Sequence, residues 1–405
     1  MRKSTKKKRW LRFRHRVVRN VAYAILAPYS HFKYGIHIKK FKEQEKRPYL
    51  ILMNHQTAFD QFFLGMAFKG PIYYLASEDI FSNGWTSSAI RYLVAPIPIQ
   101  KQTTDVKAIL NCIRIAKEGG TIALAPEGNR TYSGKTEYMS PSIVPLARKL
   151  GLPVVLYRIE GGYGVHPRWS DVVRRGKMSG SVYRVISPEE YKEMTDEEFF
   201  EQIKEGLYVN EAVADGKFRH KRCAEYLERA IYVCPECGLA RLESQGDLIT
   251  CKSCQRQVQY LPTKELRGVG FDFPFPFVSQ WYDYQSQFIN RLDVLQYTEQ
   301  PLYTESVSLT EVIPCQKKIL IADDATLSLY GDRLTLEYNG EQREYPFRQT
   351  AAVTVLGKNK LNLYYNNQIF QIQGNKRFNA LKYVHIYHRH KNITEGEKHG
   401  EFLGL

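Results

Sequence analysis

The sequence predicts an α/β protein, a sheet covered by helices, followed by two smaller parts that are rich in strands. Short apolar runs that end in polar residues, such as residues 49–53 and 121–125, alternate with stretches whose apolar residues have helical spacing. Residues 317–373 consist of short strand-like runs separated by turn residues. The length of 405 residues and the hydrophobic content of 43% allow two or three domains with a sizeable core.

A basic segment opens the chain. Ten of the first 20 residues are Lys or Arg and none is acidic, which supplies much of the formal net charge of +16. Apolar side chains recur there at helical spacing, at Trp10, Phe13, Val17, Val21 and Ile25. A basic helix with an apolar stripe is typical of segments that lie in the interface of an anionic membrane, so we expect this of residues 1–33. A disordered basic tail is the alternative.

The chain is not expected to cross a membrane or to be exported. No run of 18 apolar residues occurs, which argues against a transmembrane span. A secretory signal would place its apolar region at residues 21–27, but Arg19 and Asn20 cut that region short. We therefore expect the basic helix to be retained at the cytoplasmic face of a membrane, in a peripheral or monotopic arrangement.

A histidine follows the first of the buried strands. The apolar run 49–53 leads into Asn54 and His55, and a helix is expected from Thr57 to about Phe68. In open α/β sheets, ligands bind outside the carboxyl ends of the strands. Two residues five apart on one helix point about 140° from each other. Contact between His55 and Asp60 thus requires His55 in the turn and Asp60 in the first helical turn. A structural turn histidine is the alternative at this point.

The spacing from His to Asp is not unique in the chain. His166 is followed five residues later by Asp171, but it lies behind the glycine-rich stretch 161–164 and not at a strand end. We interpret the His166 match as accidental.

A second block of polar residues follows another short apolar strand. Residues 121–125 lead into Pro-Glu-Gly-Asn-Arg-Thr at 126–131, with Glu127 placed 72 residues after His55. With both blocks in view, the sequence resembles the glycerolipid acyltransferase family, that of 1-acylglycerol-3-phosphate and glycerol-3-phosphate acyltransferases. Members of that family carry Asn-His-x4-Asp after one strand and Pro-Glu-Gly-Thr-Arg-Ser after another. The resemblance covers roughly residues 35–210 and implies a glycerolipid-acyltransferase-type sheet covered by helices, for which we expect limits of 34–230.

The resemblance also implies roles for the two blocks. His55 would take the proton of an acceptor hydroxyl as that hydroxyl attacks an acyl thioester, and Asp60 would orient the imidazole. Arg130 would hold the acceptor phosphate, and Glu127 would order the loop or bind a glycerol hydroxyl. Gly128 would let the backbone approach closely, since it has no Cβ. Neither block shows a Ser or Cys nucleophile, so no acyl-enzyme is expected.

Three positions depart from the family pattern. Asn129 and Thr131 stand where the family has Thr and Ser, so a hydrogen-bonding side chain is kept at both. Lys101 stands where the family usually has Arg, which keeps a positive charge for a phosphate but loses the bidentate fork. A solvated charge at a strand end is the alternative for Lys101. All three are expected to bind substrate, and the departures leave the identity of the acceptor open.

The end of this region is basic and then helical. Arg168, Arg174, Arg175 and Lys177 could hold a CoA phosphate, an acidic carrier protein or lipid headgroups, with a solvated basic face as the alternative. Residues 188–230 are expected to be helical and to close the domain.

Four cysteines then change the character of the chain. Cys234, Cys237, Cys251 and Cys254 form two C-x2-C pairs with thirteen residues between them. Four thiolates from two tight turns suit tetrahedral Zn²⁺, so we expect a zinc ribbon at 231–260. Four ligands leave no open position, which predicts a structural zinc. Two disulfides are the alternative.

Nucleic-acid binding is the rival function of a different class. A zinc ribbon on a basic protein is compatible with it, but the loop of the ribbon mixes Arg241 with Glu243 and Asp247. This mixture of charges forms no basic stripe that could bind the phosphates of a nucleic acid. The cysteine turns also lack aromatic side chains on which bases could stack. Nucleic acid is therefore a disfavoured partner.

The remainder of the chain is predicted to be a linker and a β-rich domain. Residues 261–316 contain a linker rich in Gly, Pro and Phe, followed by a helix at 281–295. Residues 317–391 contain seven short strands and a final helix, with hairpin signals at 331–332, 339–340 and 366–367. This pattern resembles a pleckstrin-homology-type antiparallel barrel in architecture alone. Residues 392–405 are left as a tail.

Together these observations predict an O-acyltransferase of phospholipid biosynthesis at a membrane surface. As the resemblance implies, the acceptor would be a lysophosphatidate-like glycerolipid and the donor an acyl thioester of CoA or acyl carrier protein. Transfer to another lysolipid or to glycerol 3-phosphate is the nearest alternative, and a lipid-binding scaffold without catalysis is a further one.

Overall fold

The computed structural model describes residues 9–42, 47–99, 105–314, 316–396 and 401–404. The described chain divides into two compact units. The N-terminal unit consists of Met1–Arg130, Thr136–Gly162 and Lys177–Val209, and the C-terminal unit consists of Thr131–Lys135, Tyr163–Gly176 and Asn210–Leu405. This division does not test the domain limits expected from the sequence, which stay a prediction.

A seven-stranded mixed sheet forms the centre of the N-terminal unit, with the strand order β1-β7-β6-β2-β5-β3-β4. Strands β6, β2, β5, β3 and β4 run parallel, and β7 pairs with β6 in the antiparallel direction. The bounds are β1 Ile36–Ile38, β2 Leu50–Met53, β3 Ile72–Ser77, β4 Ile97–Ile99, β5 Thr121–Leu124, β6 Val154–Glu160 and β7 Met178–Ile186. The expected α/β class is confirmed.

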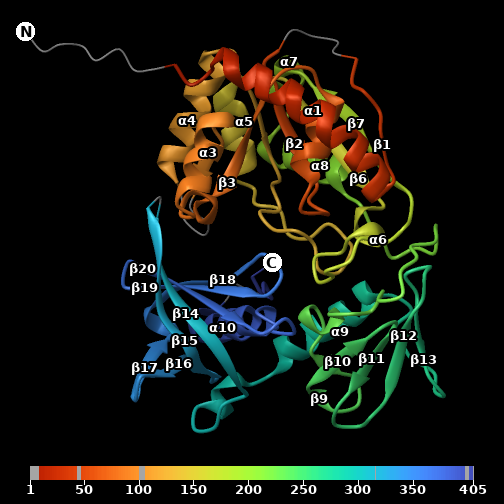
Figure 1. Ribbon diagram of the computed structural model, residues 1–405, viewed down its shortest axis with the longest axis vertical. Coiled ribbons are helices and arrows are strands. Elements are labelled where there is room, and N and C mark those ends of the chain that lie inside the picture. The colour runs from red at the N-terminus through yellow and green to blue at the C-terminus, as the bar shows by residue number, and fades with distance from the viewer. Residues whose placement is uncertain (1–8, 43–46, 100–104, 315, 397–400, 405) are drawn as a thin grey trace, which may run out of the picture. The chain divides into compact units, whose positions relative to one another are not determined.

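Helices cover both faces of this sheet (Figure 1). Helices α4, α5 and α8 pack with one another and on β4, β5 and β6, while α2 packs with α1 and on β1 and β7. The bounds are α1 Phe13–Tyr34, α2 Asp60–Ala67, α3 Trp85–Leu93, α4 Val106–Lys117, α5 Ile143–Leu150, α6 Gly162–Val165, α7 Pro188–Lys192 and α8 Asp196–Leu207. A short 3-10 turn, η1, spans Glu78–Phe81.

Strand β2 is the best example of how the sequence forms this sheet. All four of its residues are buried because β5 and β6 flank it and helices cover both faces. A strand in that position needs a continuous apolar run, as Leu50, Ile51, Leu52 and Met53 provide. Leu50 pairs with Ile122 of β5, so the carboxyl ends of β2 and β5 meet at the same edge.

The helical prediction for residues 188–230 is wrong in its second half. Helices α7 and α8 each begin with a capping box, at Ser187 and Thr195, but residues 208–226 form no helix. Their backbone groups bond elsewhere in the C-terminal unit: the Glu211 N–H donates to the Gly134 carbonyl, and Arg219 pairs with Arg175. These backbone groups form hydrogen bonds with other segments of the unit instead of forming the hydrogen bonds of a helix.

The C-terminal unit begins with small antiparallel sheets. Strands β8 and β9 form a hairpin, and β10 to β13 form a four-stranded sheet in chain order. Helix α9 follows the Phe-rich linker. The bounds are η2 Leu227–Arg229, β8 Val233–Cys234, β9 Gly238–Leu239, β10 Leu242–Gln245, β11 Leu248–Cys251, β12 Gln257–Tyr260, β13 Leu266–Gly268, α9 Val278–Arg291 and η3 Val294–Tyr297.

A second seven-stranded sheet, all antiparallel, curls around helix α10 (Figure 1). Its order is β17-β16-β15-β14-β20-β19-β18. The bounds are β14 Tyr303–Ile313, β15 Lys317–Leu329, β16 Arg333–Tyr338, β17 Glu341–Pro346, η4 Phe347–Gln349, β18 Thr350–Leu356, β19 Lys360–Tyr365, β20 Gln368–Gly374 and α10 Leu381–Glu395. The sequence had not predicted β14, and residues 317–391 contain six strands instead of the seven expected, because Lys317–Leu329 is one long strand, β15.

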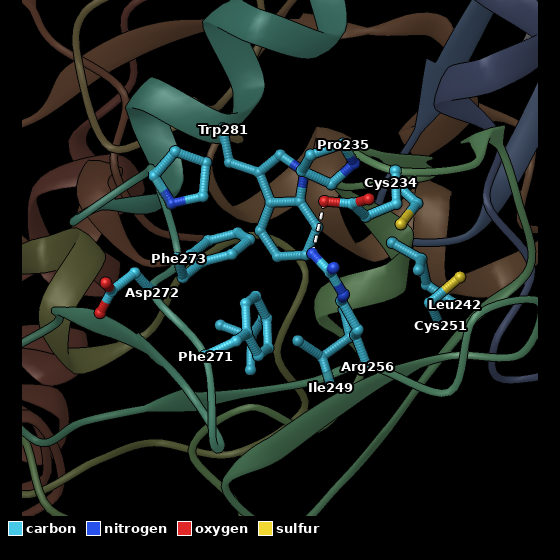
Figure 2. A pocket seen from close by; sticks show the side chains of 13 residues that line it. Cys234, Pro235, Leu242, Ile249, Cys251, Arg256, Phe271, Asp272, Phe273 and Trp281 are labelled. Carbon is cyan, nitrogen blue, oxygen red and sulfur yellow. Dashed lines mark hydrogen bonds and ion pairs between the residues drawn. The ribbon is translucent and has the colours of Figure 1, made fainter.

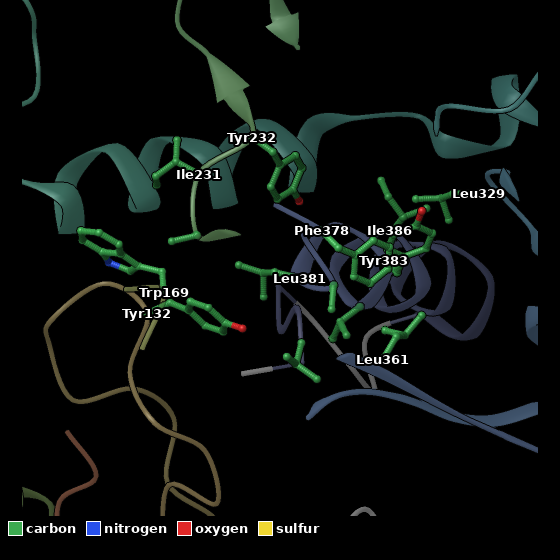
Figure 3. Close-up of a cluster of buried hydrophobic side chains, with 14 of the residues drawn as sticks. Tyr132, Trp169, Ile231, Tyr232, Leu329, Leu361, Phe378, Leu381, Tyr383 and Ile386 are labelled. Carbon is green, nitrogen blue, oxygen red and sulfur yellow. The ribbon is translucent and has the colours of Figure 1, made fainter. Parts of the chain in front are cut away.

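One hydrophobic core joins the parts of the C-terminal unit. Side chains of the cysteine-rich region, α9, the curled sheet and α10 belong to a single buried cluster. Figure 3 shows Tyr232, Leu381 and Tyr383 in this cluster, with Trp169 and Tyr132 at one side. The three hairpin signals of the sequence are found at turns, where Asn339, Gly340, Asn366 and Asn367 have positive φ.

Candidate functional site

His55 and Asp60 meet at the carboxyl end of β2. His55 lies in the turn and Asp60 is the first residue of α2, with the His55 Nδ1 atom 2.8 Å from the Asp60 Oδ2 atom. Asp60 is fully buried, whereas the His55 side chain keeps 24% of its surface exposed. The contact expected from the five-residue spacing is therefore present, with one residue in the turn and the other in the first helical turn.

Further hydrogen bonds hold Asp60 in place. Its carboxylate accepts from the N–H groups of Gln56 and Thr57 at 2.7 and 3.0 Å and from the Thr57 hydroxyl at 2.7 Å. Because the carboxylate accepts bonds at both oxygens, Nδ1 is the ring nitrogen of His55 that donates to it. The Nε2 atom then carries the lone pair, as a general base requires.

Asn54 anchors the histidine turn to the sheet. Its side-chain amide donates to the Ile159 carbonyl at 2.8 Å, and its amide oxygen accepts from the Ile159 N–H at 2.7 Å. Both bonds reach β6, the strand that pairs with β2. Neither Asn54 nor Thr57 had been predicted to act in the site. The position of Asn54 in the first block was the available signal, whereas nothing in the sequence marked Thr57.

Glu127 connects the two blocks directly. Its Oε1 atom accepts the backbone N–H of His55 at 2.8 Å, and its Oε2 atom accepts the N–H of Glu137 at 3.2 Å. The carboxyl group is enclosed although the residue as a whole is only half-buried. Burial raises the pKa of Glu127 to about 8, against the two N–H bonds, which lower it. The group is therefore largely protonated near neutral pH.

The loop after β5 is shaped by Gly128. Its φ of +68° lies in the left-handed region, and its N–H donates to the Ala125 carbonyl at 3.0 Å. A Cβ atom added at Gly128 would meet nothing within 4 Å, so the conformation and not crowding requires glycine here. Asn129, beside it, is half-buried.

Arg130 lies within electrostatic range of the histidine block. Burial raises the pKa of the Tyr34 hydroxyl; the negative charge of Asp60 raises it further, and the cation of Arg130 lowers it. Both charges therefore act on one side chain. The next residue, Thr131, is 1% exposed, and its hydroxyl accepts the Gly134 N–H at 2.9 Å. Lys101, the remaining expected substrate-binding residue, lies outside the described residues.

The His166 pattern does not form a second pair of this kind. Asp171 accepts a 2.8 Å bond from Arg229 and a 3.1 Å bond from Lys358, and His166 itself is buried. Two of the four cations expected to face ligands are also buried. Arg174 bonds to the Tyr260 hydroxyl and the guanidinium of Arg168 lies over the Tyr132 ring, so both belong to the core of the C-terminal unit.

Comparison with known proteins finds a family that the region around this site resembles. Residues 35–159 match the family model named Acyltransferase, and this range contains His55, Asp60, Glu127 and Arg130. These residues are therefore similar to the Acyltransferase family.

Two curated relatives of the acyltransferase domain are plant proteins. The chain is 23% identical over 171 residues to the chloroplastic 1-acyl-sn-glycerol-3-phosphate acyltransferase BAT2 of Brassica napus, covering 40% of this chain and 48% of the relative. It is 23% identical over 171 residues to the chloroplastic 1-acyl-sn-glycerol-3-phosphate acyltransferase LPAT1 of Arabidopsis thaliana, covering 40% and 46%. The chain thus spans about half the length of the curated relatives it matches.

Among solved structures, the chain is similar to the 1-acyl-sn-glycerophosphate (LPA) acyltransferase PlsC from Thermotoga maritima. The match has 22% identity and a TM-score of 0.40, and it covers 48% of this chain and 76% of the other.

Outside the acyltransferase domain, the four expected cysteines lie together. All four Sγ atoms are within 4.8 Å of one another, and none of the four is in a disulfide. The Sγ atoms of Cys234 and Cys254 are 3.8 Å apart, and those of Cys237 and Cys251 are 3.9 Å apart. A disulfide would bring two sulfurs to about 2.05 Å, whereas Zn–S bonds of about 2.3 Å in a tetrahedron separate them by about 3.8 Å. The cluster therefore has the dimensions of a metal site.

Aromatic side chains pack beside this cluster. Figure 2 shows the rings of Phe271, Phe273 and Trp281 grouped next to Cys234 and Cys251. The cavity between them is about 50 Å³, room for one or two water molecules. The Phe-rich linker therefore packs on an apolar surface beside the cysteine cluster.

Proposed function

We propose that this protein is an O-acyltransferase of phospholipid biosynthesis that transfers a fatty acyl group to the hydroxyl of a lysophosphatidate-like glycerolipid. The observation that carries the proposal is the His55–Asp60 pair at the end of β2, bonded through Glu127 to the loop that holds Arg130. The names of the plant relatives support this acceptor. The donor would be an acyl thioester of CoA or of acyl carrier protein.

In the proposed reaction, His55 acts as general base. Its Nε2 atom takes the proton from the acceptor hydroxyl, whose oxygen attacks the thioester carbonyl carbon. When the tetrahedral intermediate collapses, the C–S bond breaks and the imidazolium returns the proton to the leaving thiolate. Asp60 stabilises the imidazolium because its buried carboxylate faces Nδ1. General-base catalysis supplies about 10² to 10⁴-fold, so positioning of both substrates must contribute the rest.

The second block would position the acceptor. Arg130 has the planar guanidinium that suits a phosphate. Its charge and that of Asp60 both act on the pKa of Tyr34, so the two groups lie in one region. Glu127 holds the His55 backbone, so it orders the turn whether or not it also touches a glycerol hydroxyl. The left-handed turn at Gly128 leaves open space above the loop. Asn129 and Thr131 would complete the loop, and Lys101 would add a positive charge.

The membrane would be reached through α1. Phe13, Val17, Val21 and Ile25 form its apolar stripe and are 46–78% exposed. Trp10 does not belong to this exposed stripe, because its indole N–H donates to the Ala95 carbonyl. Helix α3 contacts α1 and adds the 81% exposed Trp85. Within the described residues, no helix is long and apolar enough to span a bilayer. The exposed apolar side chains of α1 and α3 support a peripheral membrane position, and we propose the cytoplasmic face of the membrane for it.

We further propose a structural Zn²⁺ at Cys234, Cys237, Cys251 and Cys254, in a zinc ribbon. The sulfur spacing supports four thiolate ligands, and four ligands leave no position for a substrate. The curled sheet with α10 at its centre would be a pleckstrin-homology-like scaffold, an assignment supported by architecture alone. Acyl carrier protein stays a candidate partner, and nucleic acid a disfavoured one.

The test is an acyl-transfer assay with labelled acyl-CoA and acyl carrier protein against a panel of lysolipids and glycerol 3-phosphate. We expect transfer to one phosphate-bearing acceptor, lost in His55→Ala. His37→Ala, which removes an exposed histidine of β1, is the matched control and should keep full activity. Full activity of purified His55→Ala protein would reject the mechanism, and a wild type without transfer to any acceptor would favour a lipid-binding scaffold.

A further inference from the structure

A basic pocket lies at the amino ends of the strands, at the opposite edge of the sheet from His55. It has a volume of about 580 Å³. Thr121 begins β5, Gly70 and Pro71 precede β3, and Arg47 precedes β2; all of them line the pocket. Because β2, β5 and β3 run parallel, their amino ends share one edge and their carboxyl ends share the other. The pocket is therefore separate from the acyl-transfer site.

Four cations line this pocket. Arg16 and Arg19 come from α1, Arg47 precedes β2, and Lys69 follows α2. No carboxylate is among the described residues that line it. Glu118, which precedes the lining residue Gly119, uses its Oε2 atom for the N–H groups of Trp10 and Leu11. A concave site lined by four cations without a carboxylate suits a phosphate group.

The fold holds two of these guanidinium groups in place. Arg19 donates to the carbonyls of Gly65, at 3.1 Å, and Phe68, and Arg47 donates to the Pro71 carbonyl at 3.4 Å. The buried Nε atom of Arg19 has no hydrogen-bond partner among the described residues. A Cβ atom at Gly70 would come within 2.8 Å of the Arg47 guanidinium, so glycine leaves room for it. Arg19 and Arg47 are thus positioned before any ligand arrives.

The chemistry of helix α1 indicates where the phosphate comes from. Arg16, Arg19 and Asn20 have i, i+3, i+4 spacing and line the pocket, while the exposed apolar stripe runs along the neighbouring flank of the same helix. A helix that lies in a membrane interface carries its basic flank at the depth of the lipid headgroups.

We propose that this pocket binds the phosphate group of an anionic phospholipid, as a second lipid site that takes no part in acyl transfer. It rests on the membrane position proposed above but not on the acyl-transfer reaction. An anionic headgroup seated between α1 and the amino ends of β2, β3 and β5 would fix the orientation of the acyltransferase domain on the bilayer.

The test is vesicle flotation of the full chain carrying His55→Ala, so that turnover plays no part. Phosphatidylglycerol vesicles are compared with phosphatidylcholine vesicles at fixed salt. Arg47→Gln with Lys69→Gln removes two pocket cations; Lys149→Gln with Lys192→Gln removes two exposed lysines of the same unit as the matched control. The apparent affinity for phosphatidylglycerol vesicles should fall about fivefold for each pocket charge and stay unchanged in the control.

Lys69→Gln alone guards against misfolding, because Lys69 is exposed; it should give about a fivefold loss. Equal losses in the pocket and control variants would mean diffuse attraction and would overturn the proposal. A calorimetric titration with glycerol 3-phosphate tests whether a soluble phosphate ester also binds in the pocket. Weak binding of glycerol 3-phosphate that is lost in Arg47→Gln with Lys69→Gln supports the site. Binding of the soluble ester together with full vesicle affinity of the double variant overturns the lipid assignment.

Discussion

At the scale of single residues, the chemistry depends on how His55 is held. Nδ1 is bonded to a fully buried carboxylate that receives three further bonds from the turn, and the backbone N–H is bonded to Glu127. His55→Ala should lower kcat by about 10² to 10⁴-fold, because the general base is lost. Zinc content, measured by atomic absorption, should be unchanged. A variant with normal kcat would show that another group takes the proton.

Asp60→Asn tests the orienting role. The amide would offer an N–H toward Nδ1 in one rotamer and leave the imidazolium without its negative partner. We expect a large loss of kcat with little change in KM for the lysolipid, measured from initial rates on mixed micelles.

Arg130→Ala should raise KM for a phosphate-bearing acceptor with little change in kcat, measured in the same assay. If both variants changed KM alone, Asp60 would belong to substrate binding.

Glu127 gives a prediction about pH. Burial raises its pKa to about 8 in the folded protein, whereas an exposed carboxyl titrates near 4.5. Between these values the unfolded chain has released a proton that the folded chain still holds. Stability should therefore fall as pH rises through this window, by at most about 1.4 kcal/mol per pH unit.

Glu127→Gln removes this titration. The free energy of unfolding of the variant, relative to that of wild type, should therefore increase as the pH rises from 5 to 8. Urea unfolding of both proteins at several pH values measures the difference. A stability difference that stays flat over that window would mean that Glu127 is ionised in the folded protein.

At the scale of elements, helix α1 would serve both proposed functions, with membrane contact on one flank and phosphate binding on the neighbouring flank. Its stripe of Phe13, Val17, Val21 and Ile25 is exposed although burial on the sheet would have been favourable. Val21→Ser with Ile25→Ser should weaken binding to phosphatidylcholine vesicles roughly 30-fold, since each side chain loses on the order of 1 kcal/mol of burial. Ala24→Ser, on the same helix, only adds a hydroxyl to a small exposed side chain and is the control. Unchanged flotation of the double variant would exclude α1 as the membrane contact.

At the scale of the whole molecule, the cysteine cluster supports more than its own turns. The cysteine-rich region shares one hydrophobic core with α9, the curled sheet and α10. Removing zinc with a chelator, or by Cys251→Ser, should therefore increase hydrogen exchange in β14–β20 as well as in β8–β13. One zinc per chain is expected in the wild type. Exchange that increases only in the cysteine turns would show that the sheet is stable without the metal.

The sequence by itself determined the parts of this protein that depend on local order along the chain. Buried parallel strands need continuous apolar runs, so β2 and β5 were visible, and with them the edge at which His55 and Glu127 meet. The five-residue step from a turn into a helix was enough to predict the His55–Asp60 contact. Two C-x2-C pairs were enough to predict the cysteine cluster, because each tight turn sets its own geometry.

Only the tertiary structure decided what depends on residues from distant segments. Arg16, Arg19, Arg47 and Lys69 have no shared motif, and the fold alone brings them to one pocket. Arg168 and Arg174 were expected to face ligands but pack on aromatic rings. Residues 208–226 were expected to be helical, but their backbone groups form hydrogen bonds with other segments. The physical reason is the same in each case. Burial and hydrogen-bond partners are properties of neighbours in space, and a sequence pattern reports only neighbours along the chain.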